Sequence, residues 1–600
     1  MQRGETEVGF RTVGTSARLM TLRSRLRSWA RTASRWLVER RLVLACGLAA
    51  ALPIVVSMAH AVAVGWFPLS DNGVIAVRSL DVLTVHPPLL GQYSAASAVI
   101  DEEIHSPGPM LYWLLALPAR LPGPSSLAVA VGLVNVLSVV GAVGLARRRA
   151  GRPLMFAVAI AVPLMLASLP AEAYSDVANP SAALLPFTLL IFLAWSLACG
   201  EYRLLPLTVL VASFVVQCHL TYVVPTIGAL AVGVVGLGAF LRRRAREAPR
   251  SPERKREQRR LRRWVVAAIL VAVVCWSAPL IEQAIHRPGN LALIARAALA
   301  DEPNLGLDAA GRAVPRAFGA VPWWLREPRH PPARVDDLSL APGLATIASS
   351  VLVLGALASV TLLGWRRRRG DVLAAGALGL VLSAAVALLA ASTPRETVQT
   401  VGYTLWWASP AGMWVWLALG WSLATLLRPV RRLATLPRPA RTGLATLGLL
   451  AVVVAVASVV SVNATHPQEP YEEMRTVAER LRTEVPPGGT TRVDASSTRD
   501  AFFMMLRFYG GAVYSLRREG REVVAPLVAP GLDDQYDAEE GDRYSRVVRV
   551  DVDKPPPEQA RLIARFAVRE GSGGRRDAVG QEAPPKRVVA VTLMPGTTAP

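Results

Sequence analysis

Apolar blocks long enough to cross a bilayer constrain this chain most strongly. They recur along its 600 residues, and each is about 18 to 24 residues long, whereas about 20 apolar residues span a ~30 Å hydrocarbon core as a helix. The composition agrees, because 52% of the residues are hydrophobic and only 18% are charged, too few for the surface of a soluble protein of this size. We therefore predict an α-helical polytopic membrane protein with about eleven transmembrane helices. The predicted spans are 42–64, 126–146, 153–169, 182–199, 204–222, 223–241, 264–284, 343–364, 372–392, 405–427 and 443–462.

The basic residues predict the orientation in the membrane. The net charge is +22, and the positive charge lies in short segments between the spans: the first forty residues, then 147–149, 242–263, 366–369 and 428–441. Because positively charged loops stay in the cytoplasm, the N-terminus is expected there, and an odd number of spans places 463–600 outside. Charge divided in this way indicates contact with anionic lipid head groups rather than with nucleic acid.

The chain divides into three predicted parts. Residues 1–41 form a basic cytoplasmic leader, and 42–462 form the multi-span module with large outer loops at 66–125 and 285–342. Residues 463–600 alternate between helix-like and strand-like patterns, which predicts a small extracytoplasmic α/β domain. In that domain, helices are predicted at 471–485, 499–510 and 557–568, and strands at 490–494, 521–525, 545–552 and 587–593. The four cysteines, Cys46, Cys199, Cys218 and Cys275, fall inside predicted spans, so no disulfide framework is implied.

The first outer loop holds the best candidate for chemistry, Asp71, a few residues beyond the first span. A carboxylate there can accept a proton from a hydroxyl group or bind a divalent metal through oxygen. The alternative is a solvated aspartate that caps the next helix. The acids Asp101 and Glu102 in the same loop have the same two interpretations: they belong to a functional site, or they are ordinary acidic residues on the loop surface.

Further polar residues lie at or near the outer ends of the spans. His219 interrupts an apolar run, and Glu282 ends the span 264–284. Polar groups at such depth are costly and usually face a cavity or a partner, although a hydrogen bond between helices would also explain them. If the fifth and seventh spans meet the first loop, these residues would line one polar cavity. Arg395 is the outer cation chosen to bind a phosphate, unless it only pairs with Glu396.

Familiar soluble-enzyme motifs are absent. The sequence contains no P-loop, no GxGxxG motif after a strand, no HExxH and no paired CxxC.

Short motifs in the outer loops resemble those of the GT-C superfamily of integral membrane glycosyltransferases, which includes protein O-mannosyltransferases, aminoarabinose transferases and arabinofuranosyltransferases. These are Asp71 directly after the first span, the His-Pro-Pro-Leu motif at 86–89, the His-Ser-Pro-Gly-Pro motif at 105–109 before the apolar 110–115, and the Glu-Ala-Tyr-Ser-Asp segment at 172–176. Two departures concern the metal: many family members carry an adjacent acidic pair where Asn72 follows Asp71, and the second proline motif lacks Pro-Pro.

The resemblance implies a reaction at the outer face of the plasma membrane. A sugar would pass from a polyprenyl-phosphate donor to a glycan, lipid or protein acceptor of the cell envelope, with Asp71 as the catalytic base. A divalent metal, Mg²⁺ or Mn²⁺, would bind at Asp71 and Asp176 if the enzyme uses one. The residues expected to bind substrate are His86, Asp101, Glu102, His105, Tyr112, Glu172, Asp176, Asn179, His219, Glu282 and Arg395.

Two other classes of function stay open at this stage. A transporter or flippase of lipid-linked sugars would have broken helices and polar residues near the bilayer midplane, often in two related halves. A noncatalytic envelope scaffold or sensor would use the C-terminal domain as a binding module. The sequence shows no internal repeat, and its polar candidates lie near the outer face, which favours the transferase.

Overall fold

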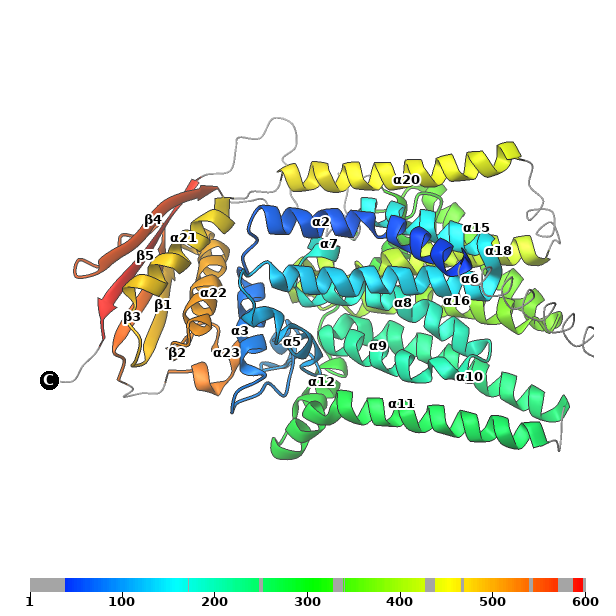
Figure 1. Cartoon of the computed structure of the whole chain (residues 1–600), viewed down its shortest axis with the longest axis horizontal. Helices are drawn as coiled ribbons and strands as arrows, with labels where there is room; N and C mark the ends of the chain where they lie inside the picture. Colours follow the sequence, from blue (N-terminus) through cyan, green and yellow to red (C-terminus); the bar gives the residue numbers. More distant parts are fainter. Residues whose placement is uncertain are drawn as a thin grey trace, which may run out of the picture.

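The structure is a computed structural model that describes residues 38–170, 172–247, 252–326, 338, 340–426, 438–465, 469–538, 543–569 and 586–596. The predicted leader lies outside the described residues up to residue 37, as does most of the basic segment 428–441. In the remaining parts, long helices run along the long axis of the molecule, and a small sheet domain covers one end (Figure 1).

The described helices form a multi-pass membrane bundle. Six of them are long and apolar enough to cross a membrane. The bent pair of Val38–Ala50 and α2, whose halves meet at 54°, makes a seventh if the pair is counted as one span. The bundle helices are α2 (Leu52–Ala63), α6 (Ser126–Ser168), α8 (Asn179–Ala198), α9 (Leu205–Cys218), α10 (Val223–Glu247), α11 (Pro252–Ile285), α15 (Leu344–Arg366), α16 (Gly370–Ser392), α18 (Ala408–Leu426) and α20 (Arg438–Thr465). All eleven predicted span regions contain helix. The helix α8 lies at the centre of the bundle, because its whole apolar stretch is buried inside the protein.

The long helix α6 unites two predicted spans, 126–146 and 153–169. Its backbone breaks at Gly151, where φ is 79°, a conformation that glycine adopts without a steric penalty. Asn135 of the first arm donates a hydrogen bond of 2.9 Å to the carbonyl of Tyr174, just beyond the second arm. The arms are therefore antiparallel, and the arginines around Gly151 lie at one end of the bundle.

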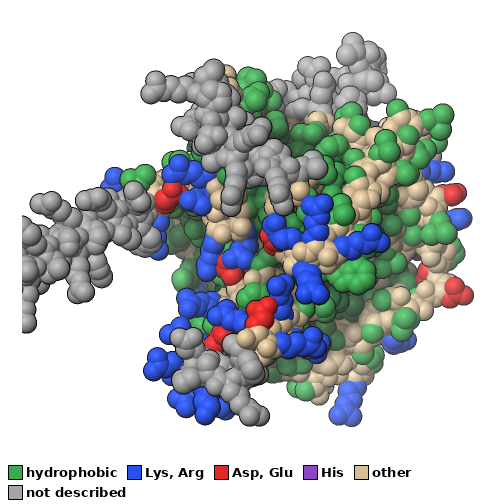
Figure 2. All heavy atoms as spheres, turned by 90° about the vertical axis from the view of Figure 1, so that its right-hand side faces the viewer, with side chains coloured by type: hydrophobic (Ala, Val, Ile, Leu, Met, Phe, Trp, Pro, Cys, Tyr) green, Lys and Arg blue, Asp and Glu red, His purple; other side chains and the backbone are tan. Residues whose placement is uncertain are grey.

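The two ends of the bundle differ in charge. Lysine and arginine side chains gather on the end opposite the sheet domain (Figure 2). The other end carries short helices between the spans: α3 (Asp71–Asp81), α4 (Ser97–Ile100), α5 (Met110–Leu115), α7 (Glu172–Ser175), α12 (Asn290–Ala298), α13 (Gly306–Phe318) and α17 (Val401–Thr404). This separation matches the charge pattern along the sequence. An even number of predicted spans separates each basic segment from the next, so all the basic segments are expected on the same side of the membrane.

The C-terminal part is an α/β domain, as predicted. Its helices are α21 (Glu469–Glu484), α22 (Phe502–Arg518) and α23 (Ala529–Leu532), and its strands are β1 (Thr491–Ser497), β2 (Val523–Val524), β3 (Arg546–Val552), β4 (Arg561–Arg569) and β5 (Lys586–Pro595). The sheet has the order β2-β1-β3-β5-β4. The strands β1, β2 and β3 are parallel, whereas β5 runs antiparallel to β3 and β4.

One element of this domain was predicted wrongly. The segment 557–568 was expected to be helical, but its residues from 561 onward belong to the strand β4, which pairs antiparallel with β5. The pairing has an irregularity between Leu562 and Ala564, so the neighbouring Ile563 and Ala564 are both buried. Pairing with a strand that lies later in the chain therefore overrides the local helical pattern.

The helix α3 joins the two parts of the molecule. It packs against α5 of the membrane part and α22 of the C-terminal domain, and each of its residues from 73 to 81 is buried. The backbones touch where α3 begins: a Cβ atom on Gly73 would lie 2.6 Å from the carbonyl oxygen of Gly510, and one on Gly510 would lie 2.6 Å from that of Ser70. Only glycine permits this approach, so the C-terminal domain directly supports the start of α3.

Candidate functional site

The site is built around Asp71, the first residue of α3. The preceding residue, Ser70, has a φ of 52°, an uncommon conformation for a non-glycine residue. The Asp71 side chain remains accessible to solvent, but the protein around it raises the pKa of its carboxyl group by desolvation. A carboxylate that is accessible yet incompletely hydrated is a stronger base than an ordinary surface aspartate.

Two tyrosines lie near this carboxylate. Burial raises the pKa of Tyr403, and the negative charge of Asp71 raises it further. For Tyr112 of α5, burial also raises the pKa; Arg78 opposes this shift and Asp71 adds to it. The Tyr112 hydroxyl donates a hydrogen bond of 3.1 Å to Gln92 Oε1. Both phenols therefore stay protonated at neutral pH, and both belong to the electrostatic environment of Asp71.

A second carboxylate lies beside the start of α3. Asn72 Nδ2 donates a hydrogen bond of 2.7 Å to Asp176 Oδ1, and the same oxygen accepts one of 2.7 Å from the backbone nitrogen of Val177. The other end of the Asn72 amide, Oδ1, is buried and has no hydrogen-bond partner among the residues that the structure describes. An unsatisfied buried acceptor is costly, so this oxygen marks a place where a cation or a donor group would be favourable.

His219 approaches the site from the break between α9 and α10. Its ring lies 6.1 Å from that of Tyr403, edge to face. The backbone nitrogen of Thr221 donates to His219 Nδ1 at 3.3 Å, so a neutral ring carries its proton on Nε2. One residue earlier, the carbonyl of Cys218 accepts a hydrogen bond of 3.0 Å from Asn179 Nδ2.

The site therefore gathers five of the residues named from the sequence: Asp71, Tyr112, Asp176, Asn179 and His219. They come from α3, α5, the segment after α7, the start of α8 and the end of α9. Tyr403, which precedes α18, was not among the named residues, although it lies in a predicted outer loop. Nothing in its local sequence sets it apart from other loop tyrosines.

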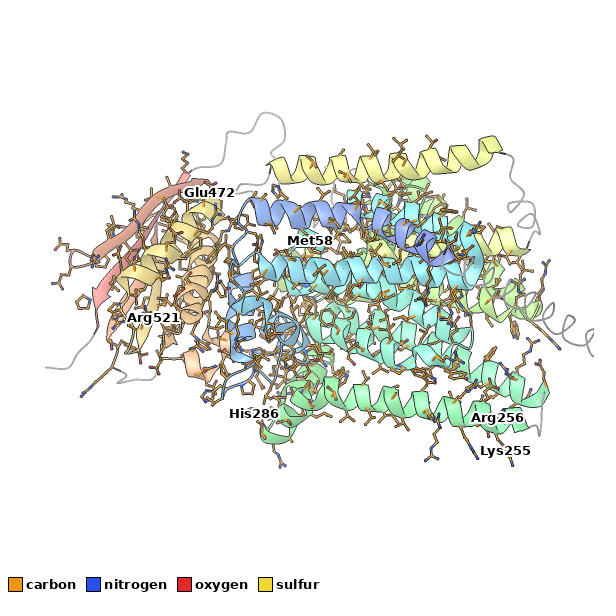
Figure 3. The ribbon with its side chains drawn as sticks, in the orientation of Figure 1. Met58, Lys255, Arg256, His286, Glu472 and Arg521 are labelled. Carbon is orange, nitrogen blue, oxygen red and sulfur yellow. The ribbon has the colours of Figure 1, made fainter. Side chains whose placement is uncertain are left out.

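Two predicted residues form a separate group. Glu282 is 5% exposed, and its two carboxylate oxygens accept from the backbone nitrogen of Asn290 at 3.0 and 3.1 Å, the usual role of an acid at a helix N-terminus. His105 contacts the same Asn290: its backbone nitrogen donates to Asn290 Oδ1 at 2.8 Å, and its carbonyl accepts from Nδ2 at 3.0 Å. His286, labelled in Figure 3, lies 3.5 Å from Glu282. These contacts fasten α11 and α12 to the first loop.

The other residues predicted to bind substrate do not join the group around Asp71: most lie on the surface, and one has a side chain that is not among those described. His86 is exposed beyond the far end of α3, and Asp101 is exposed with a left-handed backbone. Glu102 pairs with Arg296 at 2.9 Å. Arg395 is exposed, and its Nε donates to the carbonyl of Asn304 at 3.3 Å. Glu172 begins α7, but its side chain is outside the described residues.

A buried charge network behind the site escaped the sequence analysis. Asp81, the last residue of α3, is fully buried and accepts hydrogen bonds of 2.9 Å from Arg78, Arg517 and Tyr536. Arg78 also contacts Asp533 at 3.0 Å. Three of these residues belong to the C-terminal domain, so the network fixes that domain to α3. No local pattern could have revealed it, because Asp81 and its partner Arg517 lie 436 positions apart in the chain.

Comparisons with known proteins identify solved structures that are similar to this chain. No protein-family model and no curated protein matches the sequence. Among solved structures, the chain is similar to ArnT from Cupriavidus metallidurans bound to undecaprenyl phosphate, with 14% identity and a TM-score of 0.45. The similarity covers 91% of this chain and 97% of that one. At this degree of likeness, the activity has to be argued from the site.

Proposed function

We propose that this protein is a GT-C-type glycosyltransferase of the cell envelope. It transfers a sugar from a polyprenyl-phosphate donor to a glycan, lipid or protein acceptor. The observation that carries the proposal is Asp71, an accessible carboxylate with a raised pKa at the end of a membrane bundle. A lipid donor needs no nucleotide-binding domain, and its phosphate is held at the membrane surface, where this carboxylate lies.

In the proposed reaction, Asp71 accepts the proton of an acceptor hydroxyl group. The hydroxyl oxygen then forms a bond to the anomeric carbon of the donor sugar, and the bond from that carbon to the phosphate oxygen breaks. The electron pair leaves with the lipid phosphate, and the configuration at the anomeric carbon inverts. The hydroxyl of Tyr403 and the Nε2 proton of His219 are the donors best placed to orient sugar hydroxyl groups. Arg395 is the proposed cation for the phosphate.

A divalent cation fits the oxygen atoms beside Asp71. Asp71 and Asp176 supply carboxylates, and Asn72 Oδ1 is a buried oxygen without a partner in the described part of the chain. Mg²⁺ and Mn²⁺ prefer such oxygen ligands and are often held by one or two carboxylates together with substrate phosphate. Among the described residues, no group of three or more His, Cys, Asp or Glu side chains could hold a metal by itself. The cation would neutralise charge on the leaving phosphate.

The proposal also fixes an orientation. The end that carries α3 and the C-terminal domain would face the outside of the plasma membrane, and the arginine-rich end would face the cytoplasm (Figure 2). This follows from the tendency of basic loops to remain in the cytoplasm. The acceptor would then be reached from the outer surface, and the donor from the outer leaflet.

The test measures release of polyprenyl phosphate from synthetic polyprenyl-phosphate pentoses and hexoses, with an envelope extract as acceptor. We expect Asp71→Asn to lower the rate at least 10²-fold, since general base catalysis contributes about that much. The matched control is Asp308→Asn, which removes an exposed carboxylate in the loop 285–342. Full activity in a folded Asp71→Asn protein would remove Asp71 from the mechanism. An inactive wild-type chain with every donor would count against the transferase itself.

A further inference from the structure

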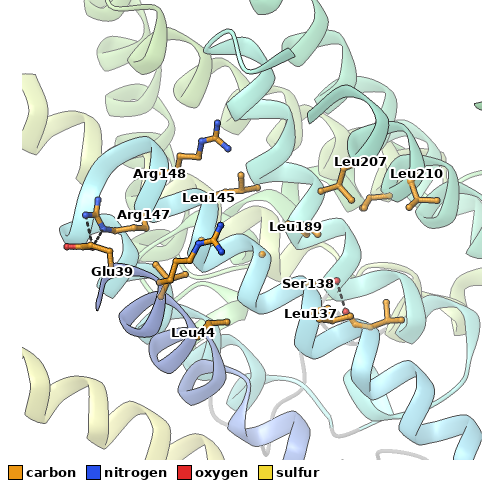
Figure 4. Close-up of a pocket in the computed structure, with 16 residues that line it drawn as sticks. Glu39, Leu44, Leu137, Ser138, Leu145, Arg147, Arg148, Leu189, Leu207 and Leu210 are labelled. Atoms are coloured by element: carbon orange, nitrogen blue, oxygen red, sulfur yellow. Dashed lines mark hydrogen bonds and ion pairs between the residues drawn. The ribbon is translucent and has the colours of Figure 1, made fainter. Parts of the chain in front are cut away.

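A groove opens at the arginine-rich end of the bundle, far from Asp71. It has a volume of about 1070 Å³ and lies between the helix Val38–Ala50 and the helices α6, α8 and α9 (Figure 4). The first predicted span and the first arm of α6 form two of its walls. The groove has no part in the proposed transfer reaction, so it calls for an explanation of its own.

The body of the groove is apolar. Its walls include the exposed side chains of Leu44, Leu137 and Leu210, and its floor includes the buried Leu189. The one hydroxyl group in this part, Ser138 Oγ, donates to the carbonyl of Val134 at 2.8 Å, so its proton is already used. Water would gain few hydrogen bonds in such a space, whereas a hydrocarbon chain fits its chemistry.

Two glycines of α6 shape the floor. A Cβ atom on Gly141 would lie 3.0 Å from Leu189 Cδ1, and one on Gly144 would lie 3.6 Å from Val43 Cγ1. Both positions line the groove. Larger side chains there would occupy the space that now lies between α6 and the helix Val38–Ala50, so the depth of the groove depends on the absence of side chains at these two positions.

The mouth of the groove is positively charged. Glu39 pairs with Arg147 at 2.7 Å and also with Arg152, while Glu201, next to this rim, pairs with Arg148 at 2.9 Å and also with Arg149. Arg40 adds a further guanidinium to the lining. Among the described residues of this rim, five arginines lie beside two glutamates, an excess of positive charge that favours an anionic group there.

The length of the groove matches one leaflet of a bilayer. It extends along α6 from Arg147 to Val134, and thirteen residues of helix rise about 20 Å. Half of a ~30 Å hydrocarbon core is about 15 Å. The groove therefore reaches from the charged rim to about the midplane. A peptide in this position would leave backbone groups unsatisfied in an apolar wall, whereas an acyl chain would not.

We propose that this groove binds an anionic phospholipid from the leaflet at the arginine-rich end. The acyl chain would lie along Leu44, Leu137 and Leu210, and the head-group phosphate would contact the guanidinium groups of Arg40 and Arg148. The lipid would fill the space between the bent first span and α6, and so hold these two helices together at the end opposite the proposed site.

The test is native mass spectrometry of the full chain, released from detergent with phosphatidylglycerol or phosphatidylcholine at equal concentration. We expect one phosphatidylglycerol to be retained per chain, with an affinity at least fivefold above that of phosphatidylcholine. Gly144→Leu should abolish retention by filling the groove. Arg148→Gln should weaken phosphatidylglycerol about fivefold, the usual effect of one basic residue near a lipid head group; Glu201 would keep Arg149 as its partner.

Two matched variants separate this site from general lipid contact. Gly355→Leu adds the same side chain on an exposed face of α15, where nothing lies within 4 Å of the new Cβ. Lys255→Gln removes one positive charge at the same end, on α11 and outside the groove (Figure 3). Both should bind phosphatidylglycerol as the unchanged protein does. Equal retention of both lipids, or retention unchanged in a folded Gly144→Leu protein, would overturn the proposal.

Discussion

Replacing Asp81 by asparagine should detach the C-terminal domain from α3. The carboxylate is fully buried and accepts bonds of 2.9 Å from Arg78, Arg517 and Tyr536. An asparagine has nearly the same shape, but it has no charge, and its NH₂ group would face donors. The change therefore leaves two guanidinium groups in a buried interface without their shared anion.

The magnitude follows from the burial of each partner. Breaking a buried ion pair by removing one partner costs about 3–5 kcal/mol. The Arg78 side chain is 6% exposed but keeps Asp533, and that of Arg517 is 22% exposed and can draw on water. We therefore expect the lower end, about 3 kcal/mol, which corresponds to a factor of roughly 10² in the docking equilibrium.

Hydrogen exchange measured by mass spectrometry reports this equilibrium directly. In Asp81→Asn, the amides of α3 and α22 should exchange about 10²-fold faster, while those of α8 stay protected. The control Asp494→Asn removes a carboxylate that pairs with Arg492 at 2.8 Å with both side chains about one third exposed, so it should cost less than about 1 kcal/mol. Unchanged protection of α3 in Asp81→Asn would refute the idea that this network holds the domain.

A second variant tests the electrostatic reason. Replacing Asp81 by leucine and Arg517 by methionine together removes the anion and one cation, and leaves Arg78 paired with Asp533. Apolar replacement of a whole buried pair is often neutral or stabilising. The double variant should therefore regain much of the protection that Asp81→Asn loses. If it exchanges as fast as the single variant, the loss comes from packing and not from unpaired charge.

Three further outcomes follow from the same structure. Burial raises the pKa of Asp71, so the acid limb of a plot of transfer rate against pH should lie above the ordinary range of aspartate. The protonated carboxyl group also stabilises the folded state, and this stabilisation should decline as the pH rises through the raised pKa of Asp71. Thermal unfolding of Asp71→Asn should accordingly occur at an equal or higher temperature at neutral pH. Gly510→Ala should destabilise the contact with Ser70 by about 1–3 kcal/mol, whereas Gly238→Ala, with nothing within 4 Å, should leave the melting temperature equal or higher. Tyr403→Phe should lower the transfer rate while circular dichroism stays unchanged, and an unaltered rate would remove its hydroxyl from the site.

Local sequence patterns were enough to predict the membrane helices and most elements of the C-terminal domain. Each predicted span region contains helix, because a long apolar run specifies a membrane helix without reference to distant residues. The helix α21 and the strands β1, β3 and β5 lie close to their predicted positions, whereas α22 ends at Arg518, eight residues beyond the predicted end. The segment 557–568 shows the limit of the method: its local pattern is compatible with a helix, and only pairing with β5 made β4 a strand.

The candidate site shows a second limit. Asp71 was selected as a carboxylate just beyond the first span, Asp176 through the family resemblance, and His219 because a polar group within an apolar run is costly. The structure places all three around one end of the bundle. The same rule also selected Glu282, whose cost is met by the start of α12. Sequence position does not reveal whether a costly group is already satisfied, since its partner can come from any other part of the chain.

By itself, the sequence determined that this chain is a multi-pass helical membrane protein with basic segments between its spans and a small α/β domain at its C-terminus. These properties depend on hydrophobicity and charge, which each segment carries locally. Only the tertiary structure decided that α3 lies between the bundle and the C-terminal domain, that Tyr403 joins Asp71, and that Asp81 is held by residues more than 400 positions away. Contacts of that kind depend on the packing of whole elements, and no local pattern encodes them.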